Sequence, residues 1–252
     1  MTSYFISGAS SGLGAEMARQ LAERGDSVAL AARRTDRLES LADVLSGGPG
    51  AVSVHTLDVT DPGAVDRVIR HADAIHGGLD VVVVNAGRGG GSRVGAGGFD
   101  KNRMVIQTNL VGALAQAETA MSLFRGRGHG HLVLVSSMAA NRGLPGSAAV
   151  YSATKAALAT LGESLRTELA GSEILITTLR PGYIRTELTS KKSPRLMTPL
   201  RRGVQAMIRA MDDNVADVVV PAWPWRPIAW VLPVLPHGLI GRVTRRRPRQ
   251  PD

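Results

Sequence analysis

The sequence predicts a single α/β domain built on a doubly wound parallel sheet of seven strands, with helices on both faces. Short apolar runs alternate with helical patterns along the chain, which is typical of parallel strands joined by crossover helices. The runs lack period-two alternation. Residues 79–84, for example, read LDVVVV, which indicates strands covered on both faces. The 252 residues contain neither an internal repeat nor an interdomain linker, and one core suffices at this length.

Each expected element corresponds to one run or one helical pattern. The strands are the apolar runs at residues 4–7, 27–31, 51–57, 81–85, 131–136, 175–179 and 217–220. The helices are the segments with helical spacing of apolar residues at 12–24, 34–45, 62–76, 99–124, 149–170 and 199–211. The glycine-rich stretch 88–98, in which six of eleven residues are glycine, is expected to be a mobile surface loop.

Composition excludes several kinds of chemistry. The chain has no cysteine, so disulfides, thiolate catalysis and sulfur-ligated zinc are excluded, and a reducing compartment is favoured. The N-terminus lacks the pattern of a secretory signal, so a cytoplasmic location is expected. His129 and His131 have no evident third ligand, so no metal site is predicted.

The turn between the first strand and the first helix predicts a phosphate site. It reads SGASSGLG and comprises Ser7, Gly8, Ala9, Ser10, Ser11, Gly12, Leu13 and Gly14. Glycines let the backbone approach a pyrophosphate, and the free N–H groups of a helix start attract an anion. An ordinary strand-to-helix turn is the alternative. The position directly between an apolar strand and an amphipathic helix favours dinucleotide binding.

The end of the second strand predicts which dinucleotide is bound. An NAD-selective site has an acidic side chain there, which would repel a 2′-phosphate. This chain has Arg33 and Arg34 instead, which favours NADP(H) over NAD(H), although Asp36 follows closely. Asp58, followed by Val59, ends the third strand, where its carboxylate either contacts the adenine or caps the next helix.

Tyr151 and Lys155 are predicted to act together, because residues four apart share a helix face. Their free pKa values, ~10 and ~10.4, do not suit proton transfer at neutral pH. Lowering the pKa of Tyr151 to near ~7 requires about 4 kcal/mol, and an ammonium about 4 Å away at an effective dielectric near 20 supplies roughly that amount. We therefore expect Lys155, aided by oxidised nicotinamide, to lower the pKa of Tyr151.

Six motifs in order resemble the classical short-chain dehydrogenase/reductase family, from residue 4 to about residue 220. They are the glycine turn, Asn85-Ala86-Gly87, Asn109 in QTNL, Ser136-Ser137, the YSATK run from Tyr151 to Lys155, and Pro181-Gly182-Tyr183-Ile184-Arg185-Thr186. The resemblance implies a Rossmann-type fold, a nicotinamide cofactor, a homodimer or homotetramer, and hydride transfer between the cofactor and a ketone or secondary alcohol.

The resemblance also implies roles for the matched residues. Tyr151 would be the general acid that protonates the carbonyl oxygen and the base in the reverse direction, and Ser137 would donate a hydrogen bond to that oxygen. Lys155 would hold the nicotinamide ribose, and Asn109 would position a water that passes protons to it. The cofactor would be bound by Ser7, Gly8, Ser10, Ser11, Gly12, Leu13, Gly14, Arg33, Arg34, Asp58, Val59, Asn85, Ala86, Gly87, Tyr151, Lys155, Pro181, Gly182, Ile184 and Thr186.

The serine assignment leaves one alternative open. In the family the serine commonly lies thirteen residues before the tyrosine, but here that position is Met138. One extra residue in the loop 139–150 makes Ser137 the expected partner, with Ser136 as the alternative.

The end of the chain departs from the family pattern. Residues 187–211 are expected to form a substrate lid within a catalytic unit 1–221, followed by an apolar extension with three tryptophans and a basic tail at 222–252. Its prolines exclude a regular membrane-spanning helix. The extension either packs over the pocket or in a subunit interface, or rests peripherally on a membrane surface. Both interpretations favour a hydrophobic substrate. The tail arginines 242, 245, 246, 247 and 249 are either solvated or bind an anionic partner.

The sequence therefore predicts an NADP(H)-dependent carbonyl reductase or alcohol dehydrogenase for a hydrophobic or lipid-like substrate. A non-catalytic NADP(H)-binding sensor or scaffold would use the same glycine turn, but it would have no need of Ser137, Tyr151 and Lys155. No nucleic-acid partner is expected, because only the charge of the tail suggests one.

Overall fold

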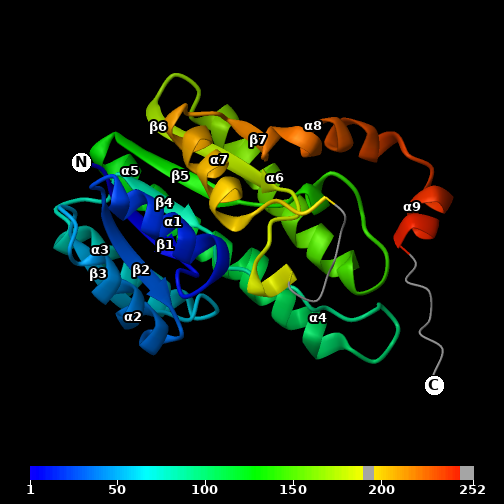
Figure 1. Ribbon diagram of the computed structural model, residues 1–252, viewed down its shortest axis with the longest axis horizontal. Coiled ribbons are helices and arrows are strands. Elements are labelled where there is room, and N and C mark those ends of the chain that lie inside the picture. Colours follow the sequence, from blue (N-terminus) through cyan, green and yellow to red (C-terminus); the bar gives the residue numbers. More distant parts are fainter. Residues whose placement is uncertain (190–195, 245–252) are drawn as a thin grey trace.

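A computed structural model describes residues 1–189 and 196–244. They form one parallel sheet of seven strands in the order β3-β2-β1-β4-β5-β6-β7, with helices on both faces (Figure 1). The strands are β1 (Ser3–Ser7), β2 (Ser27–Ala32), β3 (Val52–Thr56), β4 (Val81–Val84), β5 (His129–Val135), β6 (Glu173–Pro181) and β7 (Asp217–Val220). The helices are α1 (Gly12–Glu23), α2 (Thr35–Leu45), α3 (Pro62–Ile75), α4 (Phe99–Ile106), α5 (Gly112–Arg127), α6 (Ala149–Glu168), α7 (Leu200–Asp212), α8 (Ala222–Val231) and α9 (His237–Thr244).

The predicted fold class is confirmed, and every predicted strand is present with small shifts at its ends. The chain builds the sheet outward from β1 to β3 and then crosses to β4, which pairs with the other edge of β1 through Tyr4 and Val81. At such a reversal of strand order, the crossover helices leave on opposite faces and a crevice opens beyond the strand carboxyl ends. The topology therefore places the ligand site above β1 and β4.

The alternating side chains of each strand enter two separate cores. Tyr4 and Ile6 of β1 pack in the core beneath α1, α2 and α7, whereas Phe5 between them packs in the core beneath α3, α5 and α6. Phe5 and Ile6 are fully buried, and burying such a side chain contributes about 1.5–3 kcal/mol relative to exposure. This double burial explains why the strands read as continuous apolar runs.

The predicted helix 99–124 is wrong as a single element. The structure divides it into α4, a π-helical turn at Gln107–Val111, and α5. At the start of α5, Gly112 packs so closely on the backbone of Val59 that an added Cβ would lie 2.5 Å from the Val59 carbonyl oxygen. The π turn therefore lies directly before the point where α5 packs against the backbone that follows β3.

The apolar C-terminal extension forms two helices that were not predicted, α8 and α9, at the outer edge of the molecule (Figure 1). Pro224 is tolerated because Trp223 is non-helical and regular geometry begins only after it. Pro227 lies inside the helix, but the residue four before it, to which its missing N–H would donate, is the same non-helical Trp223. The inner face of α8 buries Trp225 and Ala229 against Met138. Among the described residues, no helix is both long and apolar enough to cross a bilayer. Residues 190–195 of the predicted lid and the tail arginines from residue 245 onward lie outside the described residues.

Candidate active site

A cavity of about 620 Å³ opens at the carboxyl ends of the strands. It runs from the turn after β1 to the loop after β6, and most of the predicted site residues line it. These are Gly8, Ser10, Ser11, Gly12, Leu13, Arg33, Arg34, Asp58, Val59, Asn85, Ala86, Gly87, Ser137, Tyr151, Lys155, Pro181, Gly182, Ile184 and Thr186. The structure therefore brings residues from six strand ends into one crevice.

Two predicted cofactor residues lie behind the cavity wall and shape it. The buried hydroxyl of Ser7 accepts hydrogen bonds from the backbone N–H groups of Asn85 and Ala86, both at 3.0 Å. Gly14 packs against Gly8, whose carbonyl oxygen would lie 2.6 Å from a Cβ at position 14. These contacts join the turn after β1 to the turn after β4, so both backbones approach the same space.

The glycine turn has the geometry of an anion site. Gly8 and Gly12 have φ values of +68° and +57°, a region that favours glycine. Ser11 occupies the N-cap of α1, but its side chain makes no capping hydrogen bond, and the first turn has no acidic residue. The free N–H groups and the positive end of the helix dipole therefore remain available for a phosphate.

Arginines surround the outer end of the cavity. Arg34 donates hydrogen bonds to the hydroxyls of Ser10 at 3.1 Å and Ser11 at 2.7 Å, so its guanidinium lies directly beside the glycine turn. Arg33 forms a 3.9 Å ion pair with Asp58 across the end of the sheet. Asp36 lies in the first turn of α2 and is not part of the cavity lining. The structure thus places cationic side chains where an NAD-selective site has an acid.

Asp58 does not cap the following helix, so that alternative is wrong. Asp61 is the N-cap of α3 and accepts a 3.0 Å hydrogen bond from the backbone N–H of Ala64. Burial alone would raise the pKa of Asp58, but hydrogen bonds from Thr60 and the charge of Arg33 lower it below its ordinary value. Asp58 is therefore an ionised carboxylate at the cavity wall near neutral pH.

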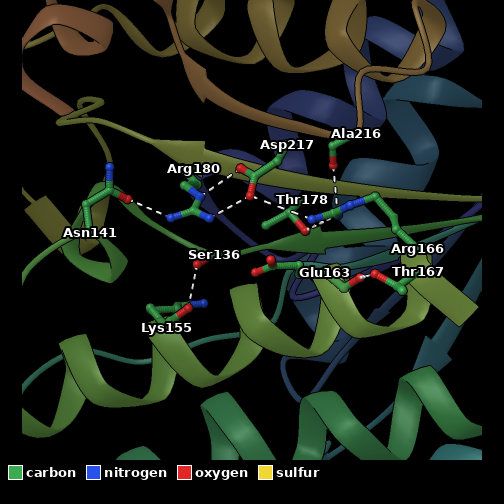
Figure 2. A network of polar contacts seen from close by, with 10 residues as sticks. All are labelled: Ser136, Asn141, Lys155, Glu163, Arg166, Thr167, Thr178, Arg180, Ala216 and Asp217. Atoms are coloured by element: carbon green, nitrogen blue, oxygen red, sulfur yellow. Dashed lines mark hydrogen bonds and ion pairs between the residues drawn. The ribbon is translucent and has the colours of Figure 1, made fainter. Parts of the chain in front are cut away.

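At the inner end of the cavity, the Ser137 hydroxyl lies beside Tyr151 and acts to lower the pKa of its phenol. Ser137 begins a short 3₁₀ turn, Met138–Ala140, and its hydroxyl also accepts a 3.1 Å hydrogen bond from the N–H of Ala139. Ser136 is buried, and its hydroxyl donates instead to the backbone carbonyl of Lys155 at 2.7 Å (Figure 2). The geometry favours Ser137 over Ser136 as the partner of Tyr151.

Lys155 lies at the floor of the cavity and is buried, with 4% of its surface exposed. Its Nζ donates a 2.7 Å hydrogen bond to the backbone carbonyl of Val135 at the end of β5. Burial lowers the pKa of Lys155 to about 8, because the surroundings disfavour the charged form. The amine is thus held in one place with a pKa close to the physiological range.

The expected lowering of the pKa of Tyr151 by Lys155 is wrong for the chain by itself. Burial raises this pKa, the hydrogen bond with Ser137 opposes the rise, and Tyr183 adds to it. Burial also weakens the charge on Lys155, since its own pKa falls. Tyr151 is therefore protonated at neutral pH, which is the form that can donate a proton.

Asn109 lies in the π turn and is fully buried. Its Oδ1 accepts from the N–H of Arg88 at 2.8 Å, and its Nδ2 donates to the Arg88 carbonyl at 3.0 Å. A Cβ at Gly87 would lie 3.5 Å from both the Asn109 Oδ1 and the Lys155 Nζ. Asn109 therefore fixes the turn after β4 and lies near the lysine without lining the cavity.

An ion-pair network holds the Ser137 turn in place (Figure 2). Arg180 of β6 forms a bidentate pair with Asp217 of β7 at 2.7 and 2.5 Å. The same guanidinium donates a 2.7 Å hydrogen bond to Asn141, which directly follows the turn Met138–Ala140. The loop that carries Ser137 is thereby tied to two strands of the sheet.

The C-terminal extension packs directly behind this inner end. A Cβ at Gly182 would lie 2.4 Å from the indole of Trp225, so only glycine fits there. Tyr183 contacts the same indole, with ring centroids 5.6 Å apart, and Met138 packs against it from the serine turn. The inner face of the extension therefore packs behind the cavity wall, and none of its described residues lines the cavity itself.

Several cavity residues were missed by sequence reasoning. They are Ala32, Leu57, Arg88, Gly89, Thr108, Val135, Ser136, Glu187 and Thr189, of which only Ser136 was considered, as the alternative to Ser137. Most of them adjoin a predicted residue and could have been found as neighbours at strand ends. Glu187 is different, because it pairs with Arg37 at 2.9 Å and Arg34 at 3.7 Å from the start of the variable lid. No sequence signal predicted that contact.

No cluster of three or more His, Asp or Glu side chains among the described residues could hold a metal.

Comparisons with known proteins agree with this site. The family model described as short chain dehydrogenase matches residues 3–196. An uncharacterized oxidoreductase of Mycobacterium tuberculosis is 47% identical over 244 residues, covering 96% of this chain and 95% of the relative. A short-chain type dehydrogenase/reductase from Mycobacterium marinum has a TM-score of 0.80 at 27% identity, covering 87% of this chain and 93% of that one. An alcohol dehydrogenase from the archaeon Thermococcus sibiricus, complexed with 5-hydroxy-NADP, has a TM-score of 0.77 at 26% identity, covering 87% and 95%.

Proposed function

Because the chain belongs to the short-chain dehydrogenase/reductase family, we propose that it is an NADP(H)-dependent oxidoreductase acting on a hydrophobic ketone or secondary alcohol. The observation that carries the proposal is the single cavity that joins the glycine turn to the pair Ser137 and Tyr151. When bound, the nicotinamide cofactor supplies or accepts the hydride.

The preference for NADP(H) rests on charge at the outer end of the cavity. Arg33 and Arg34 line it, and paired guanidinium groups suit a dianionic phosphate better than a ribose hydroxyl. The alcohol dehydrogenase of Thermococcus sibiricus, complexed with 5-hydroxy-NADP, supports the same preference by analogy. The free N–H groups of α1 would hold the pyrophosphate.

The protonation state of Tyr151 supports ketone reduction. Its raised pKa keeps the phenol protonated at neutral pH, so it can act as the general acid toward a carbonyl oxygen. Ser137 would donate a hydrogen bond to the same oxygen. Lys155 would hold the nicotinamide ribose and replenish the proton on Tyr151, since its pKa of about 8 allows it to gain and lose a proton near neutrality.

A hydrophobic substrate is favoured by the apolar cluster beside the catalytic turn. Met138 and Trp225 pack together there, and the ring of Tyr183 adjoins them. These three residues support the cavity wall from behind without lining it, and an apolar chain extending from Ser137 would run along that wall. Ketones and alcohols of graded chain length, assayed with NADPH and NADP, test the substrate class. Rates that do not rise with chain length would contradict it.

Tyr151→Phe tests the proposed reaction against a non-catalytic cofactor sensor. The variant keeps the ring but loses the proton, so we expect kcat to fall at least about a hundredfold with little change in the Kd for NADPH. Turnover retained in Tyr151→Phe would remove Tyr151 as the acid. Wild-type protein that binds NADPH tightly but reduces no carbonyl would favour the sensor.

We further propose that the protein is a homodimer or homotetramer. Supporting this, Phe99 at the start of α4 is 75% exposed, and Ile106 and Leu114 near the π turn are also exposed. Burying such side chains against a second copy would be favourable. Light scattering coupled to size exclusion gives the mass, and a monomer at micromolar concentration would contradict the proposal.

A further inference from the structure

The C-terminal segment displays apolar side chains to solvent. Trp223 and Trp230 are about four-fifths exposed, as is Val234, and Val231 and Leu239 are also exposed. We call these five residues the outer apolar face. Scattered exposed apolar residues are ordinary, but two exposed tryptophans within one short segment of a chain that has three in all indicate a surface that binds something.

The C-terminal segment is anchored to the rest of the fold by buried side chains and hydrogen bonds. Its exposed apolar side chains are therefore a surface of the folded protein and not part of an unpacked core. Trp225 and Ala229, four residues apart, are buried on the inner side of α8, which places Trp230 on the opposite side. Arg142 donates hydrogen bonds to the carbonyls of Pro233 at 2.8 Å and Leu235 at 3.0 Å. The fold therefore presents the outer apolar face on a fixed support.

A basic groove adjoins this face. A cavity of about 260 Å³ between α7, β7 and the start of α8 is lined by Arg202, Arg209 and Arg226. All three are exposed, and within the described residues their guanidinium groups make no hydrogen bond or ion pair. Of the described residues that line the groove, one is acidic, Asp213. Three cations of this kind around one hollow suit an anionic group such as a phosphate.

The groove and the apolar face share α8. Arg226 lines the groove and lies four residues before Trp230, so the two side chains project from the same side of the helix. Ala222, at the groove's edge, directly precedes Trp223. Tryptophan beside arginine is the combination that suits the interface of an anionic bilayer, where rings enter the headgroup layer and guanidinium groups contact phosphates.

Charge favours a bilayer over a second copy of the chain. Residues 222–252 contain six arginines and one acidic residue, Asp252. A two-fold interface here would set the groove arginines Arg202, Arg209 and Arg226 against their own copies, whereas anionic lipid neutralises them at about 1 kcal/mol per basic residue near the surface.

We propose that the outer apolar face and the groove of Arg202, Arg209 and Arg226 dock the protein on the surface of an anionic lipid bilayer. The tryptophans lie in the headgroup region, and the groove receives lipid phosphate. This docking does not depend on the proposed reaction, and loss of docking leaves the assay with a dissolved substrate unaffected.

Sedimentation of the full chain with vesicles tests the proposal. Vesicles of phosphatidylcholine mixed with phosphatidylglycerol should carry the wild type into the pellet, and phosphatidylcholine alone should carry much less. Arg202→Gln with Arg209→Gln and Arg226→Gln should lower the partition coefficient about a hundredfold. Trp223→Ala with Trp230→Ala should lower it at least about tenfold.

Matched controls separate docking from general charge and hydrophobicity. Arg67→Gln with Arg93→Gln and Lys101→Gln removes three exposed cations elsewhere, and Val44→Ala shortens an exposed apolar side chain on α2. Both variants should bind the anionic vesicles within about threefold of the wild type. An equal loss with the charge control would show that net charge alone acts and would overturn the proposal.

Tryptophan fluorescence gives an independent readout. Anionic vesicles should shift the wild-type emission to the blue as Trp223 and Trp230 enter the headgroup layer. The double alanine variant retains only the buried Trp225, which should report an intact fold and no shift. Absence of wild-type binding to anionic vesicles would overturn the proposal. A second result would also overturn it: light scattering shows that the wild type is an oligomer that binds no vesicles and that the tryptophan variant is a monomer. The face would then be an interface between copies of the chain.

Discussion

The hydroxyl of Ser136 donates a 2.7 Å hydrogen bond to the backbone carbonyl of Lys155, and the Lys155 amine returns one of the same length to the carbonyl of Val135. These two bonds tie the end of β5 to the helix α6 that carries Tyr151. Ser136 is thereby occupied with holding the two elements together, and Ser137 is left to face Tyr151. Ser136 thus has a structural role, and Ser137 is the serine that faces Tyr151.

This separation predicts different outcomes for the two alanine variants. Ser137→Ala should lower kcat about 10²–10³-fold, because the hydroxyl beside Tyr151 is lost, with the melting midpoint nearly unchanged. Ser136→Ala should lower the free energy of unfolding by about 1 kcal/mol, since a buried hydrogen bond is lost, and should affect kcat less. Steady-state kinetics and urea unfolding measure both variants, and the reverse pattern would exchange the two roles.

Gly182→Ala should disturb the packing behind the active site. Its Cβ would lie 2.4 Å from the indole of Trp225, and forced overpacking of this kind costs typically about 1–3 kcal/mol. We expect a lower urea midpoint and a higher KM, because Gly182 lines the cavity.

Two comparisons check that the effect comes from this contact. Gly126→Ala, where no atom lies within 4 Å of the added carbon, should be neutral or slightly stabilising in its helix. Adding Trp225→Leu to Gly182→Ala should cost less than the sum of the two single changes. Strict additivity would contradict the predicted contact.

Glu187→Gln should strengthen the binding of NADPH. Glu187 pairs with Arg37 and Arg34 at the outer end of the cavity, so its carboxylate competes with a 2′-phosphate for the same guanidinium groups. The pairs are exposed and worth about 0.2–1 kcal/mol each. We therefore expect the Kd for NADPH to fall by a factor of about two to five. Isothermal titration gives the value.

Two controls accompany this measurement. NADH lacks the 2′-phosphate, so its Kd should be unchanged by Glu187→Gln. Glu39→Gln removes the same charge from an exposed position on α2 and should leave the Kd for NADPH unchanged. A similar gain for both cofactors would indicate that Glu187 acts on the lid and not on the phosphate.

Two buried histidines predict a loss of stability in mild acid. Burial lowers the pKa of His55 to about 4, with His71 and His76 contributing, and burial likewise lowers that of His131 to about 4. The unfolded chain binds these protons near pH 6.5. The stabilisation is therefore complete above about pH 6.5 and is lost as the pH falls toward 4.

Each histidine should cost about 2 kcal/mol by pH 5. Urea unfolding midpoints measured at about pH 7.5, 6 and 5 follow this decline in stability. His131→Gln should reduce the slope, because glutamine can still bond to Thr177, the partner of His131 at 2.8 Å. A slope unchanged by the substitution would show that His131 is not a source of the loss.

The strands and the cavity could be predicted because their causes are local. Double burial produces continuous apolar runs, and glycine turns at strand ends identify the crevice. Arg33 and Arg34 follow directly from their place after β2. The features that were predicted wrongly depend on burial and on contacts between distant parts of the chain. The pKa of Tyr151 rises because burial outweighs its neighbours, and the π turn that holds Asn109 lies directly before the close contact of Gly112 with Val59.

Competing local signals explain the other differences. Asp58 and Asp61 both precede α3, and only the geometry of the turn shows that Asp61 caps it. The prolines after residue 221 excluded only a membrane-spanning helix, and the short helix α8 forms with Pro224 in its first turn and Pro227 after the non-helical Trp223. The contact between Glu187 and Arg37 joins segments 150 residues apart, a separation that no pattern in one sequence can bridge.

Trp225 is the common neighbour of Gly182, Met138 and Tyr183. A shortened chain that ended at residue 221 would lose this indole and leave a hole beside the serine turn, so the boundary marked by composition is not a place where the protein can be cut. Substitutions on the inner side of α8 would therefore alter the packing behind the serine turn. The helix that carries the outer apolar face on one side thus supports the cavity wall from behind with the other.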